Sequence, residues 1–247
     1  NIGTTITSWL LSLAGIEDGH TILTLFKPET FSPVLAMAGI VLLMAGKTEK
    51  KKNAGSILLG FSILMFGMNT MSSAVKPLGN IPEFSNLFVR FSNPVMGIIA
   101  GTILTALIQS SSASVGILQA LCMTGAIPYS AVLPIIMGQN IGTCITALIS
   151  SIGAKPNAKR AAFLHLYFNL IGTVLFMSGF YAIHLFYPFA FLEEAATPAG
   201  IAMTHSFFNL FATLVLLPFS GRLVRLAHIS VPTKTTYEAE LPVKRLA

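Results

Sequence analysis

The chain has 247 residues, of which 53% are hydrophobic and only 10% are charged. Soluble domains carry roughly 25% charged residues, so this composition excludes an ordinary soluble protein and predicts an all-α protein that crosses the lipid bilayer several times. The formal net charge of +6 is better explained by basic loops that orient membrane helices, because Lys and Arg concentrate in cytoplasmic loops. We therefore expect no nucleic-acid partner.

The charged residues lie outside the apolar segments or at their edges. No carboxylate or ammonium group is therefore expected at the middle of the membrane. The two cysteines, Cys122 and Cys144, both fall within apolar segments, where a small, buried and inert thiol is the usual state. We predict neither a disulfide nor a metal site from them.

The first part of the chain contains three apolar candidates for membrane helices, at residues 1–16, 31–46 and 55–75. A run of lysines at 47–52 follows the second candidate and marks the cytoplasmic side. Residues 76–91 carry two prolines and two asparagines among apolar residues, which suits a segment lying at the outer membrane surface better than a crossing.

The middle of the chain holds four consecutive polar residues, Gln-Ser-Ser-Ser at 109–112, between apolar stretches at 95–108 and 113–127. Uncharged polar groups are costly in hydrocarbon unless they are hydrogen-bonded. Each apolar stretch is shorter than the ~20 residues of a membrane span. Two tilted crossings stay open, but a re-entrant hairpin with the polar run at its tip fits both lengths, provided that it is buried in protein or lines a wet cavity.

The second part predicts spans at 130–153, 161–186 and 200–219, of which the first is interrupted by Gly-Gln-Asn-Ile-Gly at 138–142. The expected organisation is a transmembrane domain over residues 1–221 and a cytoplasmic tail or linker over 222–247. The basic segments that we assign to the cytoplasmic side of the inner membrane are residues 47–52, 155–160 and 222–225.

A heptapeptide occurs twice: Asn-Ile-Gly-Thr-Thr-Ile-Thr at 1–7 and Asn-Ile-Gly-Thr-Cys-Ile-Thr at 140–146. The flanking charges orient the first copy from inside to outside and the second from outside to inside. Identical motifs that cross in opposite directions indicate an inverted-topology repeat, which in transporters places the substrate near the midplane between the halves. The pattern therefore predicts a transporter.

A third similarity pairs His-Leu-Tyr-Phe-Asn-Leu at 165–170 with His-Ser-Phe-Phe-Asn-Leu at 205–210. Residues four apart share a helix face, so His165 with Asn169, and His205 with Asn209, each form a polar patch. Two interpretations stay open: hydrogen bonds that hold the helices together, or side chains that line an ion pathway.

Gln-Ser-Ser-Ser-Ala at 109–113, followed by Gly-x-Asn-Ile-Gly-Thr at 138–143, resembles the type II sodium-dependent phosphate cotransporter family, in its bacterial branch. The resemblance implies two inverted repeats, each with a Gln-Ser-Ser hairpin and an Asn-Ile-Gly-Thr segment, that carry inorganic phosphate inward. It implies sodium as the coupling ion, with no other cofactor or metal. Bacterial members often continue into a PhoU-like cytoplasmic domain or act with such a protein.

This sequence departs from the family pattern in three respects. The first-repeat hairpin is missing from it, so we expect the transport domain to be N-terminally incomplete. Gln139 stands where the family pattern leads us to expect a small residue, and Cys144 replaces the threonine of the first copy.

Because no Lys or Arg is placed to meet phosphate within the membrane, we expect helix N-termini to bind it. We predict one helix starting near Ser112, after the polar run, and a second helix break at 140–142. Sodium would be held by carbonyl, amide and hydroxyl oxygens. The predicted phosphate ligands are Gln109, Ser110, Ser111, Ser112, Asn140, Gly142, Thr143, Asn1, Thr4 and Thr5, and the predicted sodium ligands are Gln109, Ser110, Thr143, Thr146 and Thr7.

Small residues have a simpler explanation, which we favour for Gly101, Ser114 and Gly116: they permit close helix packing. Other functions stay open as well. A phosphate exporter or a phosphate-sensing membrane protein would share the fold. An intramembrane serine protease is a distant alternative, because the sequence lacks the Gly-x-Ser-x-Gly turn typical of such nucleophiles. We expect the protein not to be an enzyme.

Overall fold

The computed structural model describes residues 1–15 and 28–232. These residues form α-helices, with short 3₁₀ helices η1 (Leu13–Gly15), η2 (Lys76–Asn80), η3 (Ala190–Glu193) and η4 (Leu217–Phe219) between them. The predicted all-α fold is confirmed. In chain order the helices are α1 (Ile2–Ser12), α3 (Pro28–Ala45), α4 (Glu49–Val75), α5 (Pro82–Phe91), α6 (Pro94–Ile108), α7 (Ser111–Cys122), α8 (Tyr129–Ser150), α9 (Pro156–Phe186), α10 (Pro198–Leu216) and α11 (Ser220–Ser230).

Within the described ranges, four helical stretches are long and apolar enough to span a membrane, or five if the bent pair α5 and α6 counts as one span. The four are Glu49–Asn80, Tyr129–Ser150, Pro156–Phe186 and Pro198–Ser230. The predicted multi-pass membrane protein is confirmed by these helices.

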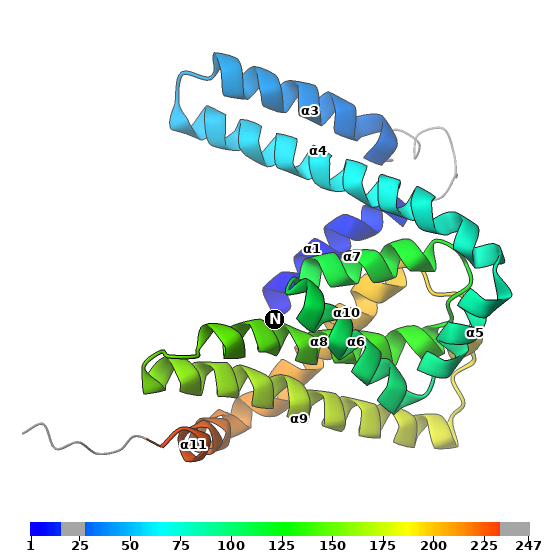
Figure 1. The fold of residues 1–247 in the computed structure, drawn as a ribbon, viewed down its shortest axis with the longest axis vertical. Helices are drawn as coiled ribbons and strands as arrows, with labels where there is room; N and C mark the ends of the chain where they lie inside the picture. The colour runs from blue at the N-terminus through cyan, green and yellow to red at the C-terminus, as the bar shows by residue number, and fades with distance from the viewer. Residues whose placement is uncertain (16–27, 233–247) are drawn as a thin grey trace, which may run out of the picture.

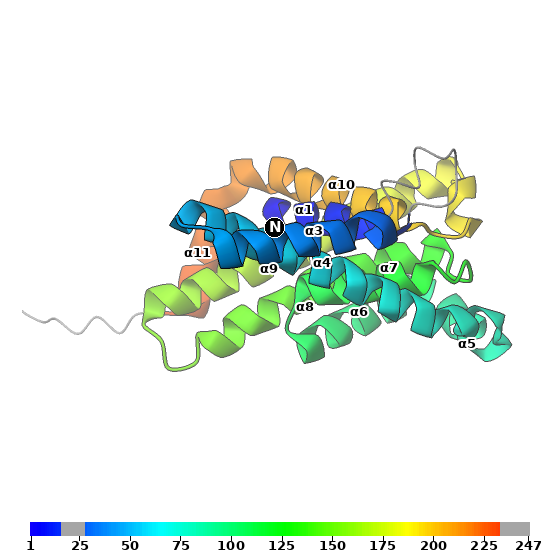
Figure 2. The ribbon, with the colours of Figure 1, turned by 90° about the horizontal axis from the view of Figure 1, so that it is seen from above.

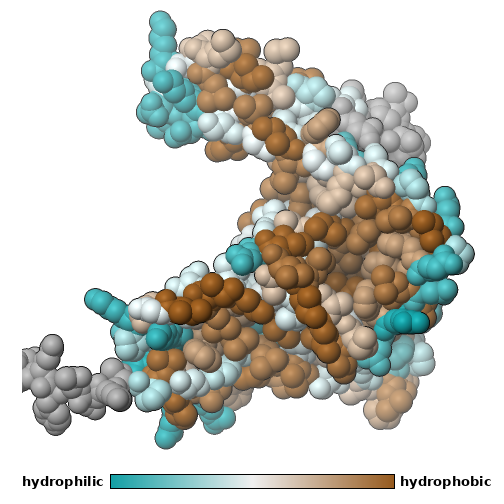
Figure 3. Space-filling model, viewed as in Figure 1, coloured by the Kyte–Doolittle hydropathy of each residue, from teal (hydrophilic) through white to brown (hydrophobic). Residues whose placement is uncertain are grey.

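Hydrophilic residues gather at two opposite ends of the molecule, with a broad apolar band between them (Figure 3). The α3–α4 loop, the α8–α9 loop and α11, which contain the three basic segments, lie at one end in both ribbon views (Figures 1 and 2). Helix α5 and η3 lie at the other end. In the same views, α1 and the second half of α8 run in opposite directions between the ends. The inverted repeat itself stays a prediction.

The polar run at 109–112 breaks the chain into two helices, as predicted. Asn93 caps α6 by accepting hydrogen bonds from the N–H groups of Val95 and Met96. Helix α6 ends at Gln109, whose φ of 57° makes it the one residue other than glycine in the left-handed region among those described. Ser110 then caps α7 by accepting from the Ala113 N–H (3.3 Å). With 15 and 12 residues, α6 and α7 fit a re-entrant hairpin better than two crossings.

The predicted break at 140–142 is wrong, because α8 runs without interruption from Tyr129 to Ser150. The Asn140 side chain is satisfied inside the helix, since its Nδ2 donates to the Ile136 carbonyl (2.9 Å). The glycines serve close packing on α6: a Cβ on Gly138 would lie 2.0 Å from the Ile98 carbonyl oxygen, and one on Gly142 would lie 2.7 Å from that of Thr102. The polar pattern therefore marks a helix–helix contact rather than a helix end.

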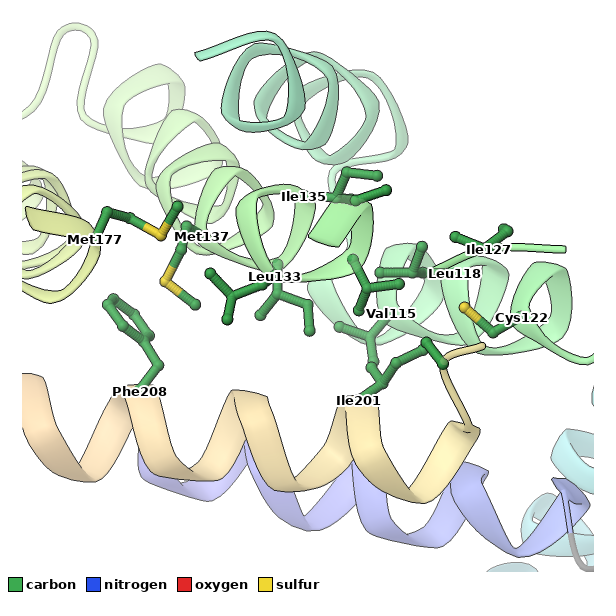
Figure 4. Packing of buried hydrophobic residues seen from close by; sticks show 14 of the residues in the cluster. Val115, Leu118, Cys122, Ile127, Leu133, Ile135, Met137, Met177, Ile201 and Phe208 are labelled. Atoms are coloured by element: carbon green, nitrogen blue, oxygen red, sulfur yellow. The ribbon is translucent and has the colours of Figure 1, made fainter. Parts of the chain in front are cut away.

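The apolar core lies between α7, α8, α9 and α10, as the close view of Figure 4 shows. Ile136 and Met137 of α8 are fully buried at its centre. Phe208 of α10 packs edge-on against Phe176 of α9, with the ring centroids 5.5 Å apart. By contrast, α3 packs mainly on α4, and the pair projects from the rest of the molecule (Figure 1).

The predicted boundary at residues 221 and 222 falls inside α11. The first part of the expected linker is therefore helical, and it packs on α9. Arg160 Nε donates to the Val231 carbonyl (3.1 Å), and the Tyr167 and Ser230 hydroxyls are 2.5 Å apart. The rest of the predicted tail, residues 233–247, lies outside the described residues, and the two-domain division stays a prediction.

Candidate functional site

A cavity of about 190 Å³ lies between α1, α7, α8, α9 and α10. This volume holds several water molecules, each of which needs about 10–15 Å³ measured in this way. The two copies of the repeated heptapeptide meet here, because Asn1 and Thr4 of the first copy and Asn140 and Thr143 of the second all line the cavity. The two copies contribute the same motif positions, the first and the fourth.

Helix α7 begins at the cavity. Ser111, its first residue, is a lining residue, so the unpaired N–H groups and partial positive charge of this helix end lie close to the cavity. Among the described residues that line it, none is Lys, Arg, Asp or Glu. The lining therefore contains no permanently charged side chain, and its backbone N–H, amide and hydroxyl groups are neutral donors.

Two histidines complete the lining, and each is hydrogen-bonded to an asparagine of the repeated motif. His165 Nε2 is 3.2 Å from Asn1 Oδ1, and His205 Nε2 is 3.2 Å from Asn140 Oδ1. An amide oxygen can only accept a hydrogen bond, so each imidazole carries a proton on Nε2.

These two bonds cross between two helix pairs. Helix α1 packs on α10, and α8 packs on α9. Yet Asn1 of α1 is bonded to α9, and Asn140 of α8 is bonded to α10. Each motif asparagine therefore connects its own helix pair to the other pair across the cavity.

The partner asparagines lie behind the histidines. Asn169 is fully buried, accepts from Asn1 Nδ2 (2.7 Å) and donates to the His165 carbonyl (3.0 Å). Asn209 donates in the same way to the His205 carbonyl (2.9 Å). Neither lines the cavity. The structure thus divides each predicted patch between a histidine that lines the cavity and an asparagine that packs behind it.

Several predicted ligands lie away from the lining. The side chains of Gln109 and Ser110 are exposed, Gly142 is packed against α6, and the Thr5 hydroxyl donates to the Ile2 carbonyl (2.6 Å). Ser112, Thr7 and Thr146 are partly buried outside the lining.

Two lining residues, Val115 and Gln139, were absent from the predicted set. Gln139 was identified only as an unexpected large residue beside the repeated motif. Its Nε2 donates to the carbonyl (3.0 Å) and hydroxyl (2.9 Å) of Ser114. The hydroxyls of Thr105 and Ser114, 2.7 Å apart, also join α6 to α7. The packing role predicted for Ser114 fits these contacts.

The family is decided by comparison with known proteins. The family model described as Na+/Pi-cotransporter matches residues 1–73 and 78–192, which is more than half of the chain. The chain belongs to the Na+/Pi-cotransporter family. This is a phosphate transporter family and not a family of enzymes, so the protease alternative is set aside and the expectation of a non-enzyme is confirmed.

This chain spans different shares of the length of its relatives. It is 28% identical over 228 residues to uncharacterized protein YqeW of Bacillus subtilis, covering 90% of this chain and 72% of that protein. It is 22% identical to "Putative inorganic phosphate export protein YjbB" of Salmonella typhimurium, covering 98% of this chain and 45% of that protein. It is 33% identical over 138 residues to human sodium-dependent phosphate transport protein 2B, covering 52% of this chain and 20% of that protein.

The chain therefore spans less than half of the relatives whose names state a phosphate activity. No solved structure matches it significantly. The matches offer no support for the predicted PhoU-like domain.

Proposed function

We propose that this chain forms most of the transport domain of a sodium-coupled phosphate symporter, with the cavity as the phosphate site. The observation that carries the proposal is the meeting of both Asn-Ile-Gly-Thr copies and the start of α7 at one cavity. At this cavity, polar groups from both halves of the predicted inverted repeat surround a volume that suits a small ion.

Phosphate would be bound by neutral donors. The N–H groups at the start of α7, the Ser111 hydroxyl and the motif asparagines are the donors that we propose from the lining. The Thr143 hydroxyl donates to the Asn140 carbonyl (2.6 Å), so its oxygen is left to accept or to bind a cation. A helix N-terminus contributes at most about 2 kcal/mol to the binding of an anion. The site therefore needs a further source of positive charge to hold a group that carries one to two negative charges.

Sodium supplies that charge. Two opposite unit charges 4 Å apart attract by about 4 kcal/mol at an effective dielectric constant near 20, which is more than the helix end provides. Binding of phosphate and sodium together is therefore favoured over binding of either ion alone. Hydroxyl and carbonyl oxygens near Thr4 and Thr143 are the sodium ligands that we propose. This coupling gives symport a physical basis.

The three basic loops at one end support a cytoplasmic orientation of that end in the inner membrane. Alternating access would then move phosphate between the basic end and the end that carries α5 and η3. The crossed asparagine–histidine bonds would break and re-form as the two helix pairs rock against each other.

Export is a second candidate for the direction of transport, and relatives named as export proteins favour it. The fold and the site would be the same. A membrane sensor of phosphate would also share them but would not move the ion. The direction follows from the sodium gradient and the coupling, both of which can be set in proteoliposomes.

The test is uptake of ³²P-phosphate by the full chain in proteoliposomes with an imposed sodium gradient. We expect uptake only with inward sodium. Uptake of equal size without sodium would remove the cotransport proposal, and saturable phosphate binding with no flux in either direction would favour a sensor.

Ser111→Ala should lower the apparent phosphate affinity about tenfold or more, because a hydrogen bond to a charged group contributes about 1.5–3 kcal/mol. Thr143→Ala should lower it through the loss of a proposed sodium ligand. The controls are Ser62→Ala on α4 and Thr213→Ala on α10, whose hydroxyls bond to their own helices outside the cavity. Unchanged kinetics in S111A and T143A would remove the assignment of the site.

A further inference from the structure

The amide of Gln139 is held in one orientation. The residue is 1% exposed, it lines the cavity, and it directly precedes Asn140 on α8. Its Nε2 donates to the Ser114 carbonyl (3.0 Å), which can only accept. The nitrogen therefore stays on the Ser114 side, and the position of the oxygen follows from it.

The Gln139 oxygen has no hydrogen-bond partner in the described part of the chain. The neighbouring amide shows the usual arrangement, because Asn140 donates to Ile136 and accepts from His205. Buried polar atoms are nearly always paired, and leaving one unpaired is unfavourable. A carbonyl oxygen on a cavity-lining residue is therefore open to a ligand that donates a hydrogen bond, or to a cation.

Among the lining residues, His205 Nδ1 is the other buried side-chain atom that has no hydrogen-bond partner in the described part of the chain. An imidazole nitrogen can gain a proton and then donate, whereas the Gln139 oxygen can only accept. Gln139 is therefore the lining group that discriminates between ligands by their protons.

We propose that Gln139 Oε1 accepts a hydrogen bond from the P–OH group of hydrogen phosphate, and so selects a protonated oxyanion. This inference rests on the proposed phosphate site. A fully deprotonated anion of similar size and charge would place an oxygen lone pair, or a fluorine, against the Gln139 oxygen. Sites that bind a substrate hydroxyl reject analogues lacking it far more strongly than apolar pockets reject a change in size.

The test compares anions as competitors of ³²P-phosphate uptake by the full chain in proteoliposomes at neutral pH. Monofluorophosphate and sulfate carry two negative charges and no proton there, whereas arsenate keeps an As–OH group. We expect arsenate to compete nearly as well as unlabelled phosphate. Monofluorophosphate and sulfate should be weaker by about 100-fold or more.

Gln139→Met removes the oxygen at nearly constant length. It should narrow the preference for phosphate over monofluorophosphate to less than about tenfold, because the rejection of the unprotonated anion is lost. Gln119→Met is the matched control. Gln119 is also a fully buried glutamine with an unpaired Oε1, and its Nε2 donates to the carbonyls of Ser8 (3.0 Å) and Pro198 (2.9 Å), but it does not line the cavity. Q119M should keep the wild-type preference.

Equal competition by monofluorophosphate and phosphate in the wild type would overturn the inference, and this comparison needs no variant. An unchanged preference in Q139M would overturn it too, as would a change confined to the sodium requirement. A narrowed preference in both Q139M and Q119M would show a general effect of packing and reject the assignment. Absence of any phosphate uptake would instead contradict the proposed function.

Discussion

The two copies of Asn-Ile-Gly-Thr form the same helical turn in different surroundings. In α8, Asn140 is 4% exposed and Gly142 is packed against Thr102 of α6. In α1, Asn1 is exposed, and a Cβ on Gly3 would meet no atom within 4 Å. Both copies nevertheless place their first and fourth residues at the cavity. The comparison shows that the motif sets which side chains line the cavity, while the α6–α7 hairpin sets how tightly the second copy is enclosed.

The largest expected difference between the copies concerns their glycines. Gly142→Ala would put a Cβ 2.7 Å from the Thr102 carbonyl oxygen. It should lower the free energy of unfolding by about 1–3 kcal/mol, a loss typical of overpacking. Gly3→Ala should leave stability unchanged or slightly raised, because alanine favours the helix. Thermal unfolding of the purified protein in detergent, followed by size-exclusion chromatography, measures both. A loss in G3A as large as that in G142A would show that another segment or molecule covers α1 at Gly3.

Substitutions of the two motif asparagines should differ less in their effect on stability. Asn140→Ala leaves the buried His205 Nε2 without its partner and should cost about 1–3 kcal/mol. Asn1→Ala removes the donor to the fully buried Asn169 Oδ1, but it should lower the free energy of unfolding by less, about 1 kcal/mol, because water can enter at the exposed Asn1 position and replace the amide. The same unfolding assay applies. Equal losses would mean that the two copies are equally enclosed.

The smallest effect is expected where the copies differ in sequence. Cys144→Thr makes the second copy identical to the first. A threonine hydroxyl can donate to the Asn140 carbonyl, which the Cys144 thiol already approaches at 3.7 Å. We expect a change in stability below about 1 kcal/mol and wild-type phosphate uptake. A marked loss of uptake in C144T would show that the thiol, and its 3.3 Å contact with Asn169, is part of what distinguishes the two halves.

Sequence reasoning predicted the membrane character, the positions of the long helices and the break at 109–112, because these depend on local composition. A run of Gln and three serines between apolar stretches favours a helix end wherever it lies. The repeated heptapeptide also identified four of the lining residues, namely the asparagine and fourth-position threonine of each copy, and the family motif identified Ser111 as a fifth.

The role of 138–142 could not be read from the same information. Gly-Gln-Asn-Ile-Gly has the composition of a helix break, yet it is the middle of a continuous helix. The reason lies outside the segment: α6 fills the groove over Gly138 and Gly142, and Ser114 of α7 binds the Gln139 amide. A backbone segment of this composition stays helical when a neighbouring helix occupies its small-residue face.

Local sequence thus determined the membrane environment, the positions of the helices, the polar break between α6 and α7 and the repeated heptapeptide. Each of these follows from the polarity and spacing of neighbouring residues. Only the tertiary structure decided that α8 is unbroken, that the asparagine–histidine bonds cross between helix pairs, and that the Gln139 oxygen is left without a partner. Those features depend on contacts between residues far apart in the chain, such as Asn1 with His165 and Asn140 with His205. Hydrogen-bond satisfaction across a cavity is a property of the packed helices and cannot be assigned to any one of them.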